Sequence, residues 1–311
     1  MKRTTLPHPF AASITKAASR QTFNMIRFLV DRERAADAYR AYGYFRWVDD
    51  TLDANALSNE KRLGFLARQK SLLELCYQGA SFRDATLEEQ MLTELVENDH
   101  VPNSGLKSYL RNMMLVMEFD ARRRGRLISQ VELNEYTCWL ATAVTEAMHY
   151  FIGHGGYAPR DESRYLAVTG AHIAHMLRDT FDDVQAGYYN IPREILAANH
   201  LQPDDIHNRA YRAWVQTRVQ LARKCFQTGR EYLTCVEGSR CKMAGFAYIA
   251  RFEWLLDTIE REDYFLRPAY SERKSLATGL RMGLSILSKL IHVHKKKIFP
   301  QPGGSHLLRE R

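Results

Sequence analysis

The sequence has no long apolar run. None of its segments approaches the ~18 consecutive apolar residues that a membrane-spanning helix requires. The N-terminal segment MKRTTLPHPFAASITKAASRQ (1–21) is basic, but it lacks the continuous apolar stretch of a secretory signal. These two absences predict a cytoplasmic protein.

Cysteine is scarce. The five cysteines are odd in number and include no CxxC pair, so the sequence supports neither a disulfide framework nor a zinc knuckle. This cysteine content is typical of a protein from a reducing compartment.

Proline is also scarce, and its absence from long stretches predicts the fold. No proline occurs between Pro9 and Pro102, or between Pro102 and Pro159. Because proline costs about 3 kcal/mol inside a helix, these gaps leave room for long helices. Apolar residues recur at three- and four-residue steps within 133–144 and 276–291, whereas alternating strand-like segments are rare.

We therefore predict a single all-α domain over residues 1–311, with about ten helices. No repeat of solenoid period interrupts it. The N-terminus at about 1–12 and the tail at about 295–311 are expected to be loose.

The net charge of +8 and the pI near 9.2 suit an acidic partner, such as nucleic acid, an anionic membrane surface or a phosphorylated substrate. The basic runs ARRRGR (121–126) and HKKKIF (294–299) are expected to be solvated. Aromatic residues do not interleave with them as in single-strand stacking platforms, so no nucleic-acid partner is expected. The second run follows a predicted amphipathic helix, which would allow peripheral contact with an anionic membrane.

Two aspartate-rich segments carry the functional signal: YGYFRWVDDTLD (42–53) and MLRDTFDDVQAG (176–187). Each residue of a helix turns about 100°, so Asp49 and Asp53 lie only about 40° apart, as do Asp179 and Asp183. Asp50 is expected to point away. A single pair of this kind is common on solvated helix faces, but two pairs, each near an arginine and in aromatic sequence, favour a binding site.

A buried aspartate pair of this kind requires nearby cations to offset its negative charge. Like charges at i, i+4 destabilise a helix, and burying uncompensated carboxylates costs far more. Hard oxygen ligands select Mg²⁺ or Mn²⁺, and Mg²⁺ commonly bridges carboxylates to phosphates. The two pairs therefore predict an acidic mouth that binds a diphosphate through metal ions, with Arg46 and Arg178 adding positive charge.

His172 and His175 lie on the helix face of the second pair and allow two interpretations. They could form a Zn, Fe or Mn site with Asp179 and Asp183. Alternatively, they could donate hydrogen bonds to diphosphate, as neutral imidazole or as imidazolium. The sequence leaves both open.

The chain resembles the squalene and phytoene synthase family of head-to-head prenyl diphosphate synthases. Residues 38–53 resemble its first aspartate motif and residues 175–192 its second. The segments 18–23, 117–145 and 252–274 are similar to its flap, its middle helix and its late helix with the following turn. The motifs occur in the family's order and span nearly the whole chain.

The resemblance implies an isoprenoid-synthase-type helical bundle with a central cavity and a Mg²⁺-dependent reaction. Ionisation of one allylic diphosphate would give a cation that a second prenyl chain attacks, forming a cyclopropylcarbinyl diphosphate. The implied catalytic residues are the metal ligands Asp49, Asp53, Asp179 and Asp183, together with Tyr42. The implied substrate-binding residues are Thr22, Phe23, Arg46, Tyr136, Leu140, His172, His175, Arg178, Asn190, Phe252 and Arg267. Participation of NADPH in a later reductive step is left open.

The sequence departs from the family pattern at several positions, which puts the product in doubt. The departures are His172 and His175 for Gln and Asn, Tyr188 and Asn190 for Arg and Tyr, Phe252 for Tyr, and Ala269 for an Arg, with Arg267 nearby. They motivate a second hypothesis: a terpene cyclase, or a prenyltransferase with another acceptor. A non-enzymatic, basic, nucleic-acid-binding helical protein is the least favoured hypothesis, because it explains only the charge.

Overall fold

The computed structural model describes residues 8–54, 58–80, 84–153 and 156–270. Within these ranges the chain forms eleven α-helices and two 3₁₀-helices, and no strand. The all-α prediction is therefore confirmed. The elements are α1 (His8–Ala18), α2 (Arg20–Leu29), η1 (Arg32–Arg34), α3 (Ala35–Asp53), α4 (Asn59–Tyr77), α5 (Leu87–Glu97), α6 (Gly105–Arg123), α7 (Gln130–Phe151), η2 (Glu162–Tyr165), α8 (Leu166–Ala186), α9 (Arg193–Ala198), α10 (Arg209–Cys235) and α11 (Ser239–Arg261).

The structure describes part of the N-terminal segment but not the C-terminal tail. Residues 8–12, which the sequence assigns to a loose segment, belong to α1 instead. Ala11 is buried and α1 packs on α3, so apolar contact orders this stretch. The amphipathic helix predicted within 276–291, the basic run at 294–299 with its predicted membrane contact, and the predicted loose tail lie outside the described residues.

None of the helices in the described ranges combines the length and the apolar character that crossing a bilayer would require.

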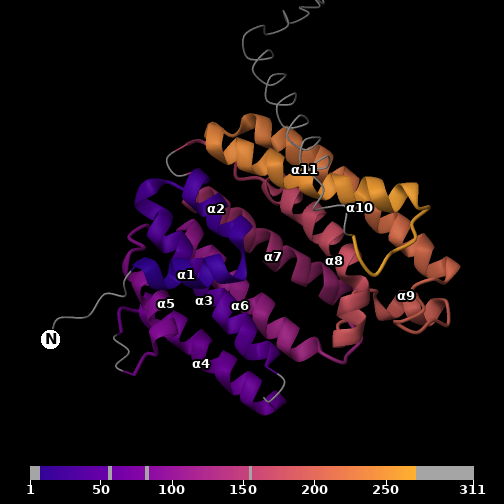
Figure 1. Ribbon diagram of the computed structural model, residues 1–311, viewed down its shortest axis with the longest axis horizontal. Helices are drawn as coiled ribbons and strands as arrows, with labels where there is room; N and C mark the ends of the chain where they lie inside the picture. Colours follow the sequence, from indigo (N-terminus) through magenta and orange to yellow (C-terminus); the bar gives the residue numbers. More distant parts are fainter. Residues whose placement is uncertain (1–7, 55–57, 81–83, 154–155, 271–311) are drawn as a thin grey trace, which may run out of the picture.

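Helix α7 lies in the middle of the molecule, between α6 and α8 (Figure 1). Its start is fixed by a capping box: Ser129 Oγ accepts the Glu132 backbone N–H at 3.2 Å, and Glu132 Oε2 accepts the Ser129 backbone N–H at 2.7 Å. Such caps contribute about 1 kcal/mol and set where a helix begins. The cap therefore fixes the positions of Tyr136 and Leu140 along α7.

Helices α10 and α11 cover α8 on the side away from α7 (Figure 1). The contact between α8 and α10 is close because it uses glycine. A Cβ atom on Gly229 would lie 2.7 Å from the backbone nitrogen of Ala167, and one on Gly170 would lie 2.9 Å from the ring of Phe226. A side chain at either position would push α8, and the aspartates it carries, out of place.

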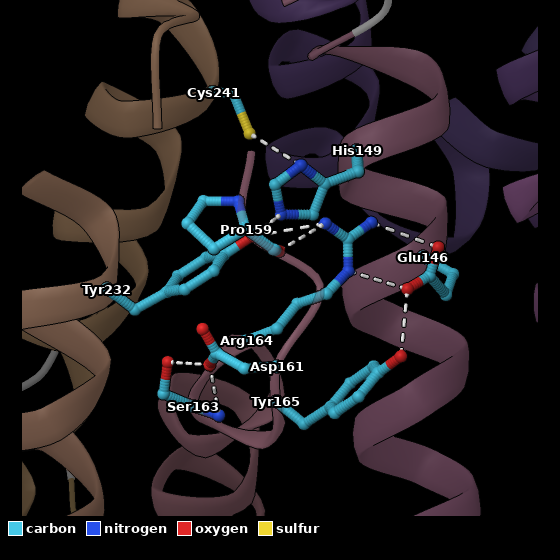
Figure 2. A network of polar contacts seen from close by, with 9 residues as sticks. All are labelled: Glu146, His149, Pro159, Asp161, Ser163, Arg164, Tyr165, Tyr232 and Cys241. Carbon is cyan, nitrogen blue, oxygen red and sulfur yellow. Dashed lines mark hydrogen bonds and ion pairs between the residues drawn. The ribbon is translucent and has the colours of Figure 1, made fainter. Parts of the chain in front are cut away.

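A buried polar network joins η2 to α7 and α10 (Figure 2). Arg164, which is 9% exposed, donates two hydrogen bonds to Glu146, from Nε at 2.7 Å and from Nη2 at 3.1 Å, and a third from Nη1 to Tyr232 Oη at 3.1 Å. Tyr232 Oη also lies 3.0 Å from His149 Nε2. We call these four residues the Arg164 network.

The Arg164 network keeps its histidine neutral. Burial, reinforced by the charge of Arg164, lowers the pKa of His149 to about 4. Cys241 Sγ lies 3.8 Å from His149 Nδ1, and burial raises the pKa of the Cys241 thiol to about 11. Neither group carries charge near neutral pH, so the network holds one ion pair whose members compensate each other.

Candidate active site

A cavity of about 470 Å³ opens between α3, α6, α7 and α8. Nine of the residues predicted for the site line it: Asp49, Asp53, Tyr136, Leu140, His172, His175, Asp179, Asp183 and Asn190. The two aspartate pairs, about 130 residues apart in sequence, therefore share the wall of one cavity.

The first aspartate pair lies at the C-terminal end of α3. Burial and the neighbouring charge of Asp53 raise the pKa of Asp49 to about 6. Arg46 Nη1 lies 3.4 Å from Asp49 Oδ2, and its Nε donates to Asp50 Oδ2 at 3.0 Å. Asp50 does not point into the cavity, as expected, but it holds the arginine beside the pair.

The second pair lies on the last turns of α8, and neighbouring groups compensate the charge of Asp179 more than that of Asp183. Asp179 accepts a hydrogen bond from Arg178 Nη2 at 2.6 Å and lies 3.0 Å from His175 Nε2. Burial alone would raise the pKa of Asp179, but these two donors outweigh it and hold the pKa below its usual range. Burial and the charge of Asp179 raise the pKa of Asp183 to about 6.

Asp120 and Arg123, on α6, complete the site and were not predicted as site residues. Arg123 donates from Nε to Asp120 Oδ1 and from Nη1 to Asn190 Oδ1, both at 2.7 Å. Tyr136 donates to Asp120 at 3.0 Å, and Asn190 donates to Asp183 at 2.6 Å. We call these five residues the Asp120 network. The charge of Asp120 contributes to the raised pKa values of both Asp49 and Asp183, so it lies within electrostatic range of both pairs.

The basic run 121–126 is thus only partly solvated, contrary to expectation. Arg122 is 58% exposed and pairs with Glu118, as expected of a surface arginine. Arg123 is 5% exposed, and both Arg123 and Arg124 line the cavity. Asp120 and Arg123 are three residues apart, a spacing at which side chains on a helix are neighbours, so the sequence does contain a pattern that predicts this ion pair.

Two glycine turns bring the ends of α6 and α8 together. Gly187 has φ +85° and Gly125 has φ +73°, backbone conformations that favour glycine. The Gly125 N–H donates to the Gly187 carbonyl at 2.7 Å, and the Tyr188 N–H donates to the Asp183 carbonyl at 2.7 Å. Through these turns Arg124, Tyr188 and Asn190 reach the cavity.

His172 lies in the cavity wall and is 6% exposed. Burial, reinforced by the positive charge of His175, Arg123 and Arg218, lowers its pKa to about 3. Of the two forms that the sequence left open for His172, burial favours the neutral imidazole near neutral pH. Its ring meets that of Tyr136 edge to face, with centroids 5.2 Å apart.

Four predicted residues lie beside the cavity wall but do not line it. Arg46 and Arg178 hold aspartates of the two pairs, as described above. Tyr42 packs, half-buried, against the core on α3. Phe252, on α11, is buried and contacts the rings of His175 and Tyr248, both of which line the cavity.

Three predicted residues lie elsewhere. Thr22 forms part of the start of α2, where its hydroxyl lies 2.9 Å from Ser19 Oγ. The ring of Phe23 packs against that of Tyr39 in a tilted arrangement, with centroids 5.3 Å apart. Arg267 Nε lies 2.9 Å from Glu262 Oε2, and its guanidinium lies over the Tyr270 ring.

Apart from Arg62 on α4, the remaining wall is apolar and aromatic. Spacing alone does not separate these side chains from the ordinary core, because both recur at the same helical steps. They are Leu52, Met113, Val116, Met117, Ala121, Val144, Met176, Tyr188 and Tyr248. The cavity therefore joins a charged rim to an apolar interior.

The carboxylate donors fit a hard divalent cation. Burial and the adjacent aspartates raise the pKa values of Asp49 and Asp183 despite the charges of Arg46 and Arg123, so a bound cation would favour both carboxylates. No three His, Cys, Asp or Glu side chains in the described ranges are grouped closely enough to hold one ion by themselves. Mg²⁺ usually takes one or two carboxylates and completes its shell with water and substrate phosphates, so pairs of this kind suit it.

Comparison with known proteins agrees with this geometry. The family model for squalene/phytoene synthase matches residues 15–276. Phytoene synthase 1 of Solanum lycopersicum, a chloroplastic protein, is 26% identical over 271 residues, which cover 82% of this chain and 63% of the tomato protein. The chain thus spans less than two thirds of that relative's length.

Solved structures share the fold. A squalene synthase, HpnC, from Alicyclobacillus acidocaldarius has a TM-score of 0.66 at 19% identity, with 84% of this chain and 95% of that chain covered. A dehydrosqualene synthase in complex with a ligand also has a TM-score of 0.66, at 14% identity, covering 93% and 96%. With the family model matching most of its length, the chain belongs to the squalene/phytoene synthase family.

Proposed function

We propose that the protein condenses two allylic prenyl diphosphates head to head through a cyclopropylcarbinyl diphosphate. One observation carries this proposal: carboxylate pairs from two separate helices, α3 and α8, line the same apolar-walled cavity. The charged rim suits diphosphate groups, and the apolar interior suits prenyl chains. Family membership supports the same class of reaction.

Asp49 and Asp53 on one side, and Asp179 and Asp183 on the other, would hold Mg²⁺ or Mn²⁺ ions. When bound, such ions act as Lewis acids that stabilise the charge on the departing diphosphate. Arg178 and His175 would turn from Asp179 toward diphosphate oxygens as the ions take over that carboxylate. Arg46, which is held by Asp50 and lies beside Asp49, would turn toward diphosphate in the same way.

The chain's own residues then keep the allylic cation from water. Tyr136, Tyr188 and Tyr248 present aromatic side chains to the cavity. Aromatic faces attract cations by about 0.5–2 kcal/mol or more when desolvated. The aliphatic residues of the wall exclude water without offering a nucleophile. A second prenyl chain in the same cavity is thereby the nearest electron donor.

A second candidate, the ionisation of a single diphosphate by a terpene cyclase or by a prenyltransferase with another acceptor, has one observation in its favour. Tyr188 and Asn190 line the cavity near the aspartates, and neither carries a positive charge for a second diphosphate. A one-diphosphate enzyme would give products with the carbon number of a single substrate.

Incubation with farnesyl or geranylgeranyl diphosphate and Mg²⁺, followed by mass spectrometry of the organic extract, tests the proposal. We expect a hydrocarbon with twice the carbon number of the substrate and release of both diphosphates. Products that contain only one prenyl chain would favour the second candidate. Intact substrate after prolonged incubation would contradict both.

A further inference from the structure

His172 is unusual among the polar groups of the cavity because its buried nitrogen lacks a partner. Its Nε2 atom is shielded from solvent and makes no hydrogen bond to any of the described residues. A buried polar atom without a partner is costly, so such atoms are uncommon in folded proteins and each requires an explanation. Asp120, Asn190 and Asp183, in the same cavity, all have hydrogen-bond partners.

The position of His172 along α8 separates it from the diphosphate rim. It precedes Asp179 by seven residues, which is about 10 Å along a helix axis. Under the proposed function the aspartates would hold the ions and the diphosphate. His172, deeper along α8 and against the Tyr136 ring, would then lie nearer the prenyl chains.

The surroundings of His172 keep the imidazole in its basic form. Burial is the main cause, and the titratable and charged groups that add to it are His175 on its own helix, Arg123 on α6 and Arg218 on α10. A neutral ring does not repel a carbocation. It also has an unprotonated nitrogen, and an allylic carbocation is a far stronger acid than any imidazolium, so even a weakly basic imidazole can accept its proton.

We propose that His172 is the catalytic base that ends the condensation, so that the product is an alkene formed by proton loss. This inference rests on the proposed function. After the second diphosphate leaves, a C–H bond next to the final cation breaks. Its electron pair becomes the central C=C bond, and the proton forms an N–H bond on His172. Bulk water or released diphosphate takes this proton at product release, and no reductant is needed.

The wild-type protein provides the first test. With substrate deuterated at C1, Mg²⁺ and no NADPH, we expect a condensed alkene that has lost one deuterium more than a hydride-quenched product would. A condensed product that forms only with NADPH and retains that deuterium would overturn the role of His172 and leave the proposed function standing. Absence of any condensed product would instead overturn the proposed function itself.

The variant His172→Gln provides the second test, because an amide is polar but cannot take up the proton. A general base contributes about 10²–10⁴ in rate, so the ratio of condensed alkene to alcohols and cyclopropylcarbinyl diphosphate should fall by at least ~10-fold. His207→Gln, at an exposed histidine outside the cavity, should leave the ratio unchanged. Circular dichroism and melting curves would verify folding. An unchanged ratio in folded His172→Gln would overturn the proposal.

Discussion

The protein has two polar regions beside α7 with opposite properties, the Arg164 network and the cavity. In the Arg164 network the cation meets the carboxylate of Glu146 through two hydrogen bonds, and the histidine, His149, lies within hydrogen-bond distance of Tyr232. In the cavity, Asp49 and Asp183 have raised pKa values and the histidine, His172, has an unpartnered nitrogen. Burial lowers the pKa of both histidines.

The difference indicates that the first region serves the stability of the fold and that the second is suited to charged ligands. A compensated network contributes to the folded state and gains nothing from a ligand. A cavity with excess negative charge and an unpartnered nitrogen is costly, and under the proposed function bound ions and substrate would relieve this cost. The Arg164 network should therefore respond to mutation through stability, and the cavity through turnover.

The largest expected effect is on turnover. Asp49→Ala and Asp179→Ala should each reduce turnover by ~10³-fold or more, because each removes a ligand for the ion that stabilises the leaving diphosphate. The helical circular dichroism should be unchanged, since removing Asp49 relieves its repulsion with Asp53. Turnover like that of the wild type in either variant would remove the metal-site assignment.

The second effect should appear in stability alone. Arg164→Ala leaves the carboxylate of Glu146 buried without its cation, and breaking such a pair costs about 3–5 kcal/mol. Urea unfolding measures the loss. Arg126→Ala, which breaks the exposed pair with Glu132, is the matched control and should cost less than about 1 kcal/mol. Equal costs for the two variants would contradict the comparison.

A matched pair of tyrosine variants sharpens the contrast. Tyr232→Phe removes hydrogen bonds to Arg164 and His149, and Tyr136→Phe removes the one to Asp120. Each should lower the free energy of unfolding by about 1–2 kcal/mol. Only Tyr136→Phe should also lower turnover per folded molecule. If both variants kept full turnover, the Asp120 network would be structural only.

The smallest effect is a pH dependence. The folded-state pKa of Asp49 is raised from 3.8 to about 6, so the folded protein binds more protons than the unfolded chain between these values. Asp49 therefore costs stability progressively as pH rises from about 4 to 6, by less than about 1 kcal/mol after screening by solvent.

Melting curves of the wild type and Asp49→Asn at pH 4.5 and 7.5 isolate this contribution. The variant should gain stability relative to the wild type as pH rises. His149 changes stability in the opposite direction, because its pKa is lowered to about 4, but it is present in both proteins. Mg²⁺ should reduce the difference at pH 7.5. A difference that does not change with pH would contradict the raised pKa.

Much of the fold follows from local rules. The long stretches without proline contain α3 to α5 and α6 to α7, and the i, i+4 spacing put both aspartate pairs on single helix faces. The spacing also put His172 on the face of the second pair, whereas Tyr136 and Leu140 were named by the resemblance, and all three line the cavity. These features depend on helix geometry alone, so the spacing of residues in the sequence is enough to predict them.

The rest depends on tertiary contact. Arg123 is buried because the turns at Gly125 and Gly187 join α6 to α8. A run of arginines in the sequence does not indicate which of its members will be buried by such a contact. Thr22, Phe23 and Arg267 were predicted from resemblance alone, and they do not line the cavity. The neutral state of His172 follows from burial, which sequence did not reveal.

The central claim is that the aspartate pairs of α3 and α8 bind diphosphate together, through metal ions. Thermal melting with Mg²⁺, with inorganic diphosphate and with both tests it without relying on turnover. A ligand that binds only the folded state raises the melting temperature, so the two together should raise it by more than the sum of their separate shifts. Asp49→Ala and Asp183→Ala should each abolish that excess. A purely additive shift in the wild type, or an excess that survives in both variants, would contradict the account.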